Sequence, residues 1–207
     1  MIVIIEYSMG NLDSVVRAFR KIGAEVRVSA DPAVVAEASG LVLPGVGAYA
    51  EAMRAISERG LAEPLRRRVL EEKRPVLGIC LGFQIMTSHG EEGDADGLGW
   101  LGGATRRFRF DPESAMKIPH MGWNDLSPVK ESPLTEGIDP RACFYFAHSY
   151  HVTDTVPGSV LATSEYGGGF VSAAAHGNIF GTQFHPEKSY GAGLRLLRNF
   201  AEMAAHA

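Results

Sequence analysis

The sequence predicts an α/β domain in which a sheet is flanked by helices. Over the first ninety residues, apolar runs alternate with helical patterns, which is typical of parallel strands joined by helical crossovers. After Gly90 the pattern changes to a polar loop and a series of short apolar runs, which indicates antiparallel strands in the later part. No repeat or linker interrupts the 207 residues, so residues 1–207 are expected to form a single domain.

The first half of the chain predicts strands and helices in alternation. The first helix follows a buried strand; Asn11 or Asp13 is its expected cap, and Gly23 is expected to end it. The expected strands span 2–6, 24–29, 40–48 (including a turn rich in proline and glycine) and 75–79, and the expected helices lie within 7–23, 48–60 and 61–73.

The second half is expected to add short strands and a closing helix. Residues 91–103 are rich in glycine and acidic side chains, which favours a loop. The strands are expected at 105–110, 143–146, 159–163, 170–175 and 179–184, and the helix at 189–204.

Charge and hydropathy argue against two broad classes of partner. The formal charge of −4 is unlike that of a broad nucleic-acid surface, and the short clusters Arg66–Arg68 and Arg106–Arg107 are expected to be solvated. No apolar run approaches the roughly 20 residues of a membrane span, and Met1 leads into a strand without a basic leader region. We therefore expect a cytoplasmic protein with no nucleic-acid and no membrane partner.

The two cysteines are expected to be free thiols. Cys80 and Cys143 stand 63 positions apart in a chain without a secretion signal, and no Cys/His spacing suggests a zinc site. We therefore expect no metal and no cofactor. Cys143 stands in the apolar segment "ACFYFA" and is expected to be a core residue.

Cys80 stands where a nucleophile is expected. It lies between Gly78 and Gly82, at the junction of the strand "PVLGI" and the helical pattern "LGFQIMTSH". A sharp strand-to-helix turn lifts its central side chain clear of the sheet, and the glycines let the backbone pass without clashes. The positive end of the helix favours thiolate over thiol. A buried structural cysteine is the alternative for this motif alone.

A base for this thiol is expected in "GTQFHPEKS". An apolar strand ends in His185, and Glu187 follows two residues later, so that both side chains project to one side of an extended backbone. The imidazole can hold a thiolate and protonate a leaving amine, while the carboxylate fixes its tautomer. The set Cys80, His185 and Glu187 therefore predicts nucleophilic catalysis.

These motifs resemble the class I, or triad, glutamine amidotransferases. "GICLGFQ" matches the nucleophile motif and "FHPEKS" the His/Glu motif. In order along nearly the whole chain, "IEYSMGNLDSV", "LPGVGAYAEAM", "EEGDADGLGWL", "IPHMGWN" and "YFAHSYHV" resemble the family of glutaminase subunits of imidazole glycerol phosphate synthase. The resemblance implies a flavodoxin-like, mixed and mostly parallel sheet, and hydrolysis of glutamine to glutamate and ammonia through a thioester on Cys80.

The resemblance also implies further site residues. The backbone N–H groups of Val46 and Leu81 would form the oxyanion hole, although "PGVG" alone also suits a plain tight turn. Gln84 lies four residues after Cys80, on the same helix face. The residues carried over as substrate contacts are Gly47, Gln84, Glu92 for the α-amino group, and His148, Ser149 and Tyr150 around the α-carboxylate. Glu92 is equally suited to a plain acidic loop, and the last three to a core strand.

A partner is implied because ammonia released into water becomes ammonium, which is no nucleophile. By resemblance the acceptor chemistry lies on a cyclase subunit with a (β/α)₈ barrel, which forms imidazole glycerol phosphate and an aminoimidazole carboxamide ribotide. Trp123, Asn124 and Lys188 resemble interface residues, although each also suits an ordinary structural place. Three alternatives stay open: the glutaminase subunit of another class I amidotransferase, a free-standing γ-glutamyl hydrolase with the same triad, and a binding module that has lost catalysis.

Overall fold

The computed structural model describes residues 1–7 and 12–207. Its helices are α1 (Leu12–Lys21), α2 (Pro32–Ala36), α3 (Tyr49–Glu58), α4 (Ala62–Arg66), α5 (Leu81–Gln84) and α6 (Tyr190–Ala205), with the π-turn η1 (Arg67–Glu71) and the 3₁₀ turns η2 (Pro133–Thr135) and η3 (Pro186–Lys188). Asn11, one of the two expected caps of the first helix, lies outside the described residues. Gly23, with φ of +80°, follows α1 as expected.

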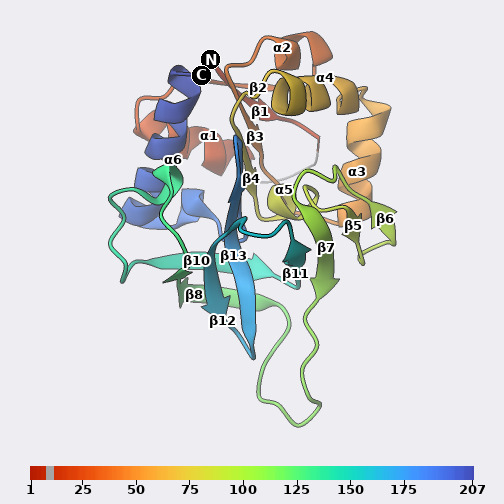
Figure 1. The fold of residues 1–207 in the computed structure, drawn as a ribbon, viewed down its shortest axis with the longest axis vertical. Coiled ribbons are helices and arrows are strands. Elements are labelled where there is room, and N and C mark those ends of the chain that lie inside the picture. Colours follow the sequence, from red (N-terminus) through yellow and green to blue (C-terminus); the bar gives the residue numbers. More distant parts are fainter. Residues whose placement is uncertain (8–11) are drawn as a thin grey trace.

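The strands run from one edge of the molecule to the other (Figure 1). They are β1 (Ile2–Ile5), β2 (Val26–Ser29), β3 (Gly40–Leu43), β4 (Val76–Ile79), β5 (His89–Gly90), β6 (Ala95–Asp96), β7 (Gly102–Arg107), β8 (His120–Asp125), β9 (Ser127–Pro128), β10 (Cys143–His148), β11 (Tyr150–Thr155), β12 (Val160–Glu165), β13 (Gly169–His176) and β14 (Ile179–Thr182). The strands expected from the sequence are all present, with ends shifted by a few residues.

One mixed sheet forms the centre of the fold. Its order is β2-β1-β3-β4-β14-β13-β11-β7-β5-β6, and β12 and β9 attach to β13. The strands from β2 to β14 pair in parallel, while β13, β11 and β12 pair antiparallel. The carboxyl ends of β3, β4 and β14 therefore meet at one edge, which is where open α/β sheets place their ligands.

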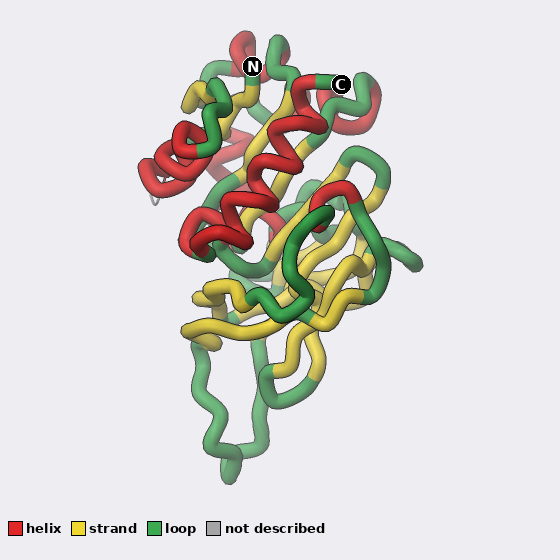
Figure 2. The backbone as a smooth tube through the Cα atoms, turned by 90° about the vertical axis from the view of Figure 1, so that its left-hand side faces the viewer, coloured by secondary structure: helices red, strands yellow, loops and turns green. Residues whose placement is uncertain are grey.

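Helices cover both faces of the parallel strands (Figure 1). On one face α1 and α6 pack through Phe19 and Phe200, whose rings meet edge to face at 6.4 Å. On the other face Tyr49 and Ile56 of α3 join Leu65 of α4 in a second buried cluster. The tube in Figure 2 shows α6 crossing the sheet diagonally and the β7–β8 loop projecting from the opposite end of the molecule.

Two strands that the sequence did not predict build the region next to the site. β8 pairs antiparallel with β10 in a separate two-stranded sheet, and β11 follows β10 after a single residue. β8 carries glycine and polar residues in "HMGWND", so its hydrophobic alternation is weak. β8 is a strand because it pairs with β10, and its own β-propensity is weak.

The helix after Cys80 is shorter than the sequence predicts, because other groups take its carbonyl oxygens. The Gln84 carbonyl accepts hydrogen bonds from the hydroxyls of Thr87 at 2.7 Å and Thr105 at 3.1 Å. The next carbonyls accept from N–H groups of the loop 97–101. A helix of one turn contributes little dipole to the site at Cys80.

Two expectations about single side chains were wrong. Cys143 is exposed, because the alternation of β10 turns Phe144 and Phe146 into the core and Cys143 outward. Arg68 is buried, and its guanidinium donates to the Ala38 carbonyl and pairs with a glutamate of the same helical segment.

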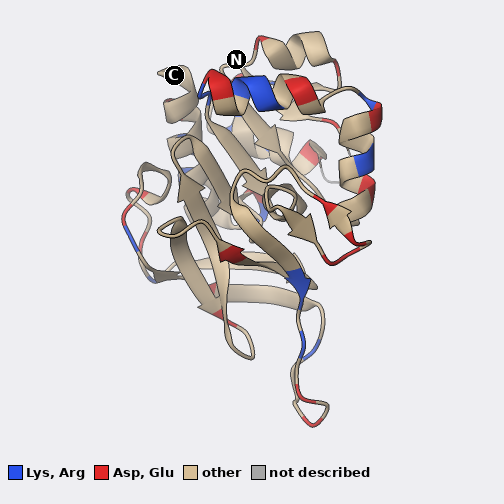
Figure 3. Cartoon of the chain, turned by 45° about the vertical axis from the view of Figure 1, so that its right-hand side comes forward, with Lys and Arg blue, Asp and Glu red and all other residues tan. Residues whose placement is uncertain are grey.

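Basic and acidic side chains alternate along the surface of α4 and η1 rather than gathering by sign (Figure 3). Arg66 pairs there with Glu63 and Glu71 at 2.8 Å each. Within the described part of the chain, no helix has both the length and the apolar character needed to cross a membrane.

Candidate active site

Cys80 stands on a strained turn between β4 and α5. Its φ of 53° and ψ of −105° lie in a region that non-glycine residues rarely adopt, as in other nucleophile turns. The two flanking glycines are required sterically. A Cβ on Gly82 would lie 1.7 Å from the Leu43 carbonyl oxygen, and one on Gly78 would lie 2.6 Å from that of Gly82. The glycine-flanked strand-to-helix turn expected from the sequence is present, and Cys80 itself is buried.

His185 and Glu187 form a buried pair after β14. The His185 Nδ1 and a Glu187 carboxylate oxygen are 2.9 Å apart, and both side chains are almost fully buried. Glu187 lies in the turn η3, so a 3₁₀ turn rather than an extended backbone brings the two together. Since the carboxylate accepts the Nδ1 proton, the Nε2 side of the ring is left to act on the thiol.

The charge state of His185 depends on Cys80. Burial alone would lower the pKa of His185, but the charge of the Cys80 thiolate, its hydrogen bond and the Glu187 carboxylate together raise that pKa to about 10. Beside a charged Cys80, His185 is therefore protonated at neutral pH, and the imidazolium is ready to protonate a leaving group.

Cys80 lines a cavity of about 280 Å³, which suits a ligand the size of an amino acid. The cavity brings together every residue that the sequence assigned to the oxyanion and to glutamine: Val46, Gly47, Leu81, Gln84, Glu92, His148, Ser149 and Tyr150. It also contains Pro119, Met121 and Ala147, which the sequence did not predict. "IPHMGWN" contains the first two, and only the start of β8 at the cavity explains their place.

The turn at Pro44–Gly47, where the oxyanion donor Val46 is expected, packs against α5. A Cβ on Gly45 would lie 2.9 Å from the Tyr7 hydroxyl and 3.2 Å from Leu81, and Gly47 has φ of +130°. The Tyr7 hydroxyl donates to the Pro44 carbonyl, which anchors the start of the turn. As the first residue of α5, Leu81 has a backbone N–H without an acceptor inside its own helix.

Gln84 and Glu92 are both held by the backbone. Gln84 donates from Nε2 to the Tyr150 carbonyl at 2.8 Å. One Glu92 oxygen accepts the Tyr49 N–H at 2.9 Å, at the start of α3, where Ala48 supplies no side-chain cap. Glu92 thus brings a negative charge to the cavity at a fixed place.

His148 is part of a hydrogen-bonded chain of neutral groups. The Tyr150 carbonyl can only accept, so His148 donates to it from Nδ1 at 2.8 Å. The His148 Nε2 then accepts from Nδ1 of His120 at 3.0 Å, and the His120 Nε2 accepts from Asn124 at 3.4 Å. Burial lowers the pKa of His120 to about 4 and that of His148 to about 3, so both rings are neutral at neutral pH. Both nitrogens of His148 are occupied, and its place at a substrate carboxylate stays a prediction.

An exposed aromatic patch lies beside the cavity. We define it by Met121 and Trp123 of β8, Tyr145 of β10, Lys188 and Tyr190. The Trp123 ring stacks on Tyr190 at 5.1 Å with an interplanar angle of 8°, and the Lys188 amine lies 5.6 Å from the centre of the Tyr145 ring.

Strand alternation decides which side chains of β8 join this patch. Met121 and Trp123 are exposed on one face, whereas the Asn124 side chain turns the other way and donates to the Glu165 carbonyl at 3.0 Å. Trp123 and Lys188 therefore share a surface, and Asn124 supports the strand from behind. Its expected place at an interface stays a prediction.

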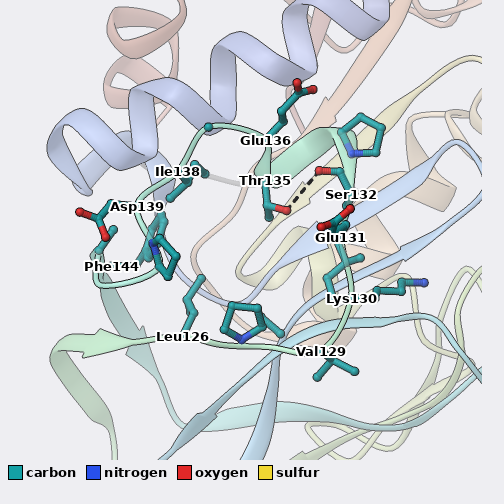
Figure 4. Close-up of a pocket in the computed structure, with 17 residues that line it drawn as sticks. Leu126, Val129, Lys130, Glu131, Ser132, Thr135, Glu136, Ile138, Asp139 and Phe144 are labelled. Atoms are coloured by element: carbon teal, nitrogen blue, oxygen red, sulfur yellow. Dashed lines mark hydrogen bonds between the residues drawn. The ribbon is translucent and has the colours of Figure 1, made fainter.

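A larger cavity of about 830 Å³ lies elsewhere, between the segment 126–142 and β12 (Figure 4). Its wall includes Leu126, Ile138 and Phe144, and the Thr135 hydroxyl donates to the Ser132 carbonyl at 3.2 Å along one side. None of its lining residues is a cysteine or a histidine. The smaller cavity is therefore the candidate for chemistry.

These features define a thiol-dependent, amide-cleaving enzyme of the triad type. They are a cysteine on a strand-to-helix turn, a buried His/Glu pair after the neighbouring parallel strand, and a small cavity at the carboxyl edge of the sheet. The model of the family "Glutamine amidotransferase class-I" matches residues 3–204, so the chain belongs to the class I glutamine amidotransferases. The flavodoxin-like α/β fold expected from the sequence is confirmed.

Within this family, the chain is similar over its whole length to one kind of subunit. The chain is 46% identical to "Imidazole glycerol phosphate synthase subunit HisH" of Syntrophotalea carbinolica, with 98% of this chain and 100% of that one covered. It is 45% identical to the HisH 1 subunit of Campylobacter jejuni serotype O:23/36 and 40% identical to the HisH 2 subunit of Pseudomonas aeruginosa, again with 98% and 100% covered.

Solved structures show the same fold at lower identity. A putative GMP synthase protein from Thermoplasma acidophilum superposes with a TM-score of 0.75 at 20% identity, covering 99% of this chain and 94% of that one. The structure of PurLQS from Thermotoga maritima superposes with a TM-score of 0.73 at 19% identity, with 97% of each chain covered.

Proposed function

We propose that this chain is the glutaminase subunit of an imidazole glycerol phosphate synthase, which hydrolyses glutamine and delivers ammonia to a cyclase subunit in histidine biosynthesis. The observation that carries the proposal is the buried triad of Cys80, His185 and Glu187 at a cavity of amino-acid size. The full-length likeness to HisH subunits supports the choice among class I amidotransferases.

The chemistry begins when Cys80 sulfur attacks the side-chain amide carbon of glutamine. The oxygen that becomes negative is stabilised by the N–H groups of Leu81 and Val46, and one such donor typically contributes about 10²–10³ in rate. The His185 imidazolium protonates the departing nitrogen and ammonia leaves. A thioester remains, and water deprotonated by the now neutral His185 attacks it to release glutamate.

Glutamine is held by groups fixed in advance. The Glu92 carboxylate, anchored by the Tyr49 N–H, attracts the α-ammonium group. Gly47 and Gln84 line the cavity with the nucleophile, and Ser149 and Tyr150 also line it, where the α-carboxylate would bind. Fixed partners reduce the loss of side-chain entropy when substrate binds.

The aromatic patch is the proposed docking face for the cyclase, a (β/α)₈-barrel subunit. Met121 belongs to both the patch and the cavity wall, so ammonia leaving the cavity would emerge next to this face. Trp123 and Tyr190 are 47% and 78% exposed, and large exposed aromatics concentrate at protein interfaces. The cytoplasmic location inferred from the sequence stays a prediction.

The test measures glutamate release by the chain alone, with the candidate cyclase subunit, and with that subunit plus its nucleotide ligand. We expect slow release alone and stimulation by about 10²-fold or more with partner and ligand, as a gain of one oxyanion donor would give. Equal rates in all three would reject the coupled glutaminase and favour the free-standing γ-glutamyl hydrolase. Absence of thiol modification by a glutamine-mimicking electrophile would favour a binding module.

A further inference from the structure

Gln183 lies beside the nucleophile and beside Gln84, which lines the substrate cavity, yet the triad chemistry gives it no role. It directly follows β14, is fully buried, and its backbone N–H donates to the Ser172 carbonyl at 2.9 Å. Its side chain reaches two groups of the site. The Nε2 lies 3.7 Å from the Cys80 sulfur, and the Oε1 lies 3.3 Å from Nε2 of Gln84.

The orientation of this amide follows from a neighbouring carbonyl. The Tyr150 carbonyl can only accept, so the end of Gln84 that lies 2.8 Å from it must be its NH₂ group. The same NH₂ group faces Gln183, which must therefore present its oxygen there. The Gln183 NH₂ group is left to point at the Cys80 sulfur, and a reversed amide would place two NH₂ groups against each other.

Two contacts of the sulfur favour opposite protonation states. The Ala147 carbonyl, 3.9 Å from the Cys80 sulfur, can accept from a thiol S–H and so favours the thiol. The Gln183 NH₂ group can only donate and so favours the thiolate, because hydrogen bonds strengthen when the acceptor is charged. The single turn of α5 adds little to this balance.

We propose that Gln183 is a further catalytic residue, whose side-chain amide donates a hydrogen bond to the Cys80 thiolate and holds it toward the glutamine cavity. The proton that leaves the thiol goes to His185, so Gln183 stabilises the ion pair without exchanging a proton. This role rests on the proposed glutaminase chemistry. In this role Gln183 supplies the stabilisation of the thiolate charge that the N-terminus of a longer helix would otherwise provide.

Other titratable groups also face the sulfur and enter any measurement of its ionisation. His185, oriented by Glu187, comes from the turn after β14. Tyr7 comes from the end of β1, and burial, with a smaller effect of the Cys80 charge, raises the pKa of its phenol well above the usual range. His148 shares the cavity and is neutral. A variant of Gln183 leaves these groups in place.

The test uses the full chain in a Cys143→Ser background, since Cys143 is exposed and would also react. The rate of Cys80 alkylation by iodoacetamide is followed against pH by mass spectrometry for wild type, Gln183→Met and the isosteric Gln183→Glu. We expect the midpoint to rise by about one pH unit in Gln183→Met, a tenfold loss of thiolate, and by more in Gln183→Glu, where a carboxylate faces the sulfur. The kcat for glutamine should fall about tenfold, with a smaller change in KM.

A matched control separates this role from packing. Asn199 is another buried amide, which donates to the carbonyls of Leu134 and Glu136 at 3.0 and 2.8 Å, remote from Cys80 in the fold. Asn199→Leu should lower the melting temperature without moving the alkylation midpoint. If neither Gln183 variant moves the midpoint although both melt cooperatively, the proposal is overturned. Should Gln183→Met fail to fold, Gln183→Glu decides alone. Retention of glutaminase activity in Cys80→Ala would instead reject the proposed function itself.

Discussion

The His185/Glu187 pair and the aromatic patch are neighbours in the fold, yet different forces hold them. His185 and Glu187 are buried and linked by a charged hydrogen bond of 2.9 Å. Trp123 and Tyr190 are exposed and touch only through stacked rings. A buried, charge-assisted contact fixes geometry without help from a partner, whereas exposed stacked rings keep apolar surface in water that a partner can cover. The comparison indicates a His/Glu pair whose geometry is set within the chain and an exposed surface that association could cover.

Tyr145 contacts both regions. The Tyr145 carbonyl accepts the His185 N–H at 2.8 Å, and the Tyr145 ring contacts Trp123 at 5.9 Å and the Lys188 amine. Lys188 is also the residue after Glu187. Tyr145 therefore contacts both the patch and the backbone of His185.

The largest expected effect is at the nucleophile. Cys80→Ala should lower glutamate release by about 10⁴-fold or more, since no covalent intermediate can form. Affinity for the cyclase subunit, measured by calorimetry, should stay within about twofold, because Cys80 is buried away from the patch. Synthesis fed with ammonium should survive in the complex. Loss of both affinity and ammonium-dependent synthesis would show that Cys80 is structural.

The next effect distinguishes the two members of the buried pair. His185→Ala should cost about 10³–10⁴ in kcat, because the imidazole moves protons in both half-reactions. Glu187→Gln should cost less, about 10–10², since it weakens one charge-assisted hydrogen bond and leaves the ring in place. The double variant Cys80→Ala/His185→Ala should be scarcely worse than Cys80→Ala. A larger loss for Glu187→Gln than for His185→Ala would contradict these roles.

Local sequence signals predicted the catalytic centre because its constraints are local. Gly78 and Gly82 are needed within two residues of Cys80, and Glu187 lies two residues from His185, so the motifs are visible in single segments. Glu187 is reached through a 3₁₀ turn rather than the expected extended backbone, and the pair is still in contact. The parallel strands β1, β3 and β4 followed for the same reason, since each is a continuous buried run.

What the sequence did not predict depends on pairing between distant segments. β8 is a strand because it pairs with β10, and that register sets Trp123 opposite Tyr145. The stacking of Trp123 on Tyr190 also requires the start of α6 to reach β8. The contact of Gln183 with sulfur depends on the Tyr150 carbonyl, which orients Gln84. Such contacts between remote segments leave no local pattern in the chain.

The patch should show a moderate effect that depends on the partner. Trp123→Ala and Tyr190→Ala should each weaken binding of the cyclase subunit by about tenfold or more, since each loses a large apolar contact at an interface. Val129→Ala is a matched control, because Val129 is also an exposed apolar side chain, 59% accessible, at the rim of the larger cavity. Calorimetry measures all three. A loss of affinity for Val129→Ala equal to that for Trp123→Ala would move the docking face to the larger cavity.

The smallest expected effect concerns acid stability at the histidines between the two regions. His120 on β8 pairs with His148 on β10, and burial lowers their pKa values to about 4 and about 3, below the ordinary value near 6.5 of the unfolded chain. As the pH falls from 6.5 toward 4, the unfolded chain binds protons at these positions that the folded chain refuses. The free energy of unfolding should therefore decrease with acidification, by up to about 1.4 kcal/mol per pH unit for each histidine. Above pH 6.5 the stabilising contribution of the two neutral histidines should be fully present.

Carboxylates also titrate near pH 4, so the histidine contribution is isolated by difference. His120→Gln keeps a hydrogen-bonding side chain between His148 and Asn124 but cannot ionise. Its free energy of unfolding, from urea titrations at pH 7.5, 6, 5 and 4.5, should be lower than wild type at pH 7.5, where the substitution costs packing. The difference in free energy of unfolding between the two proteins should narrow as the pH falls, because only the wild type is then destabilised by keeping His120 neutral. A gap that stays constant across this range would mean that His120 ionises freely in the folded chain, and that the patch and the catalytic cavity are not joined by a neutral, buried hydrogen-bonded chain.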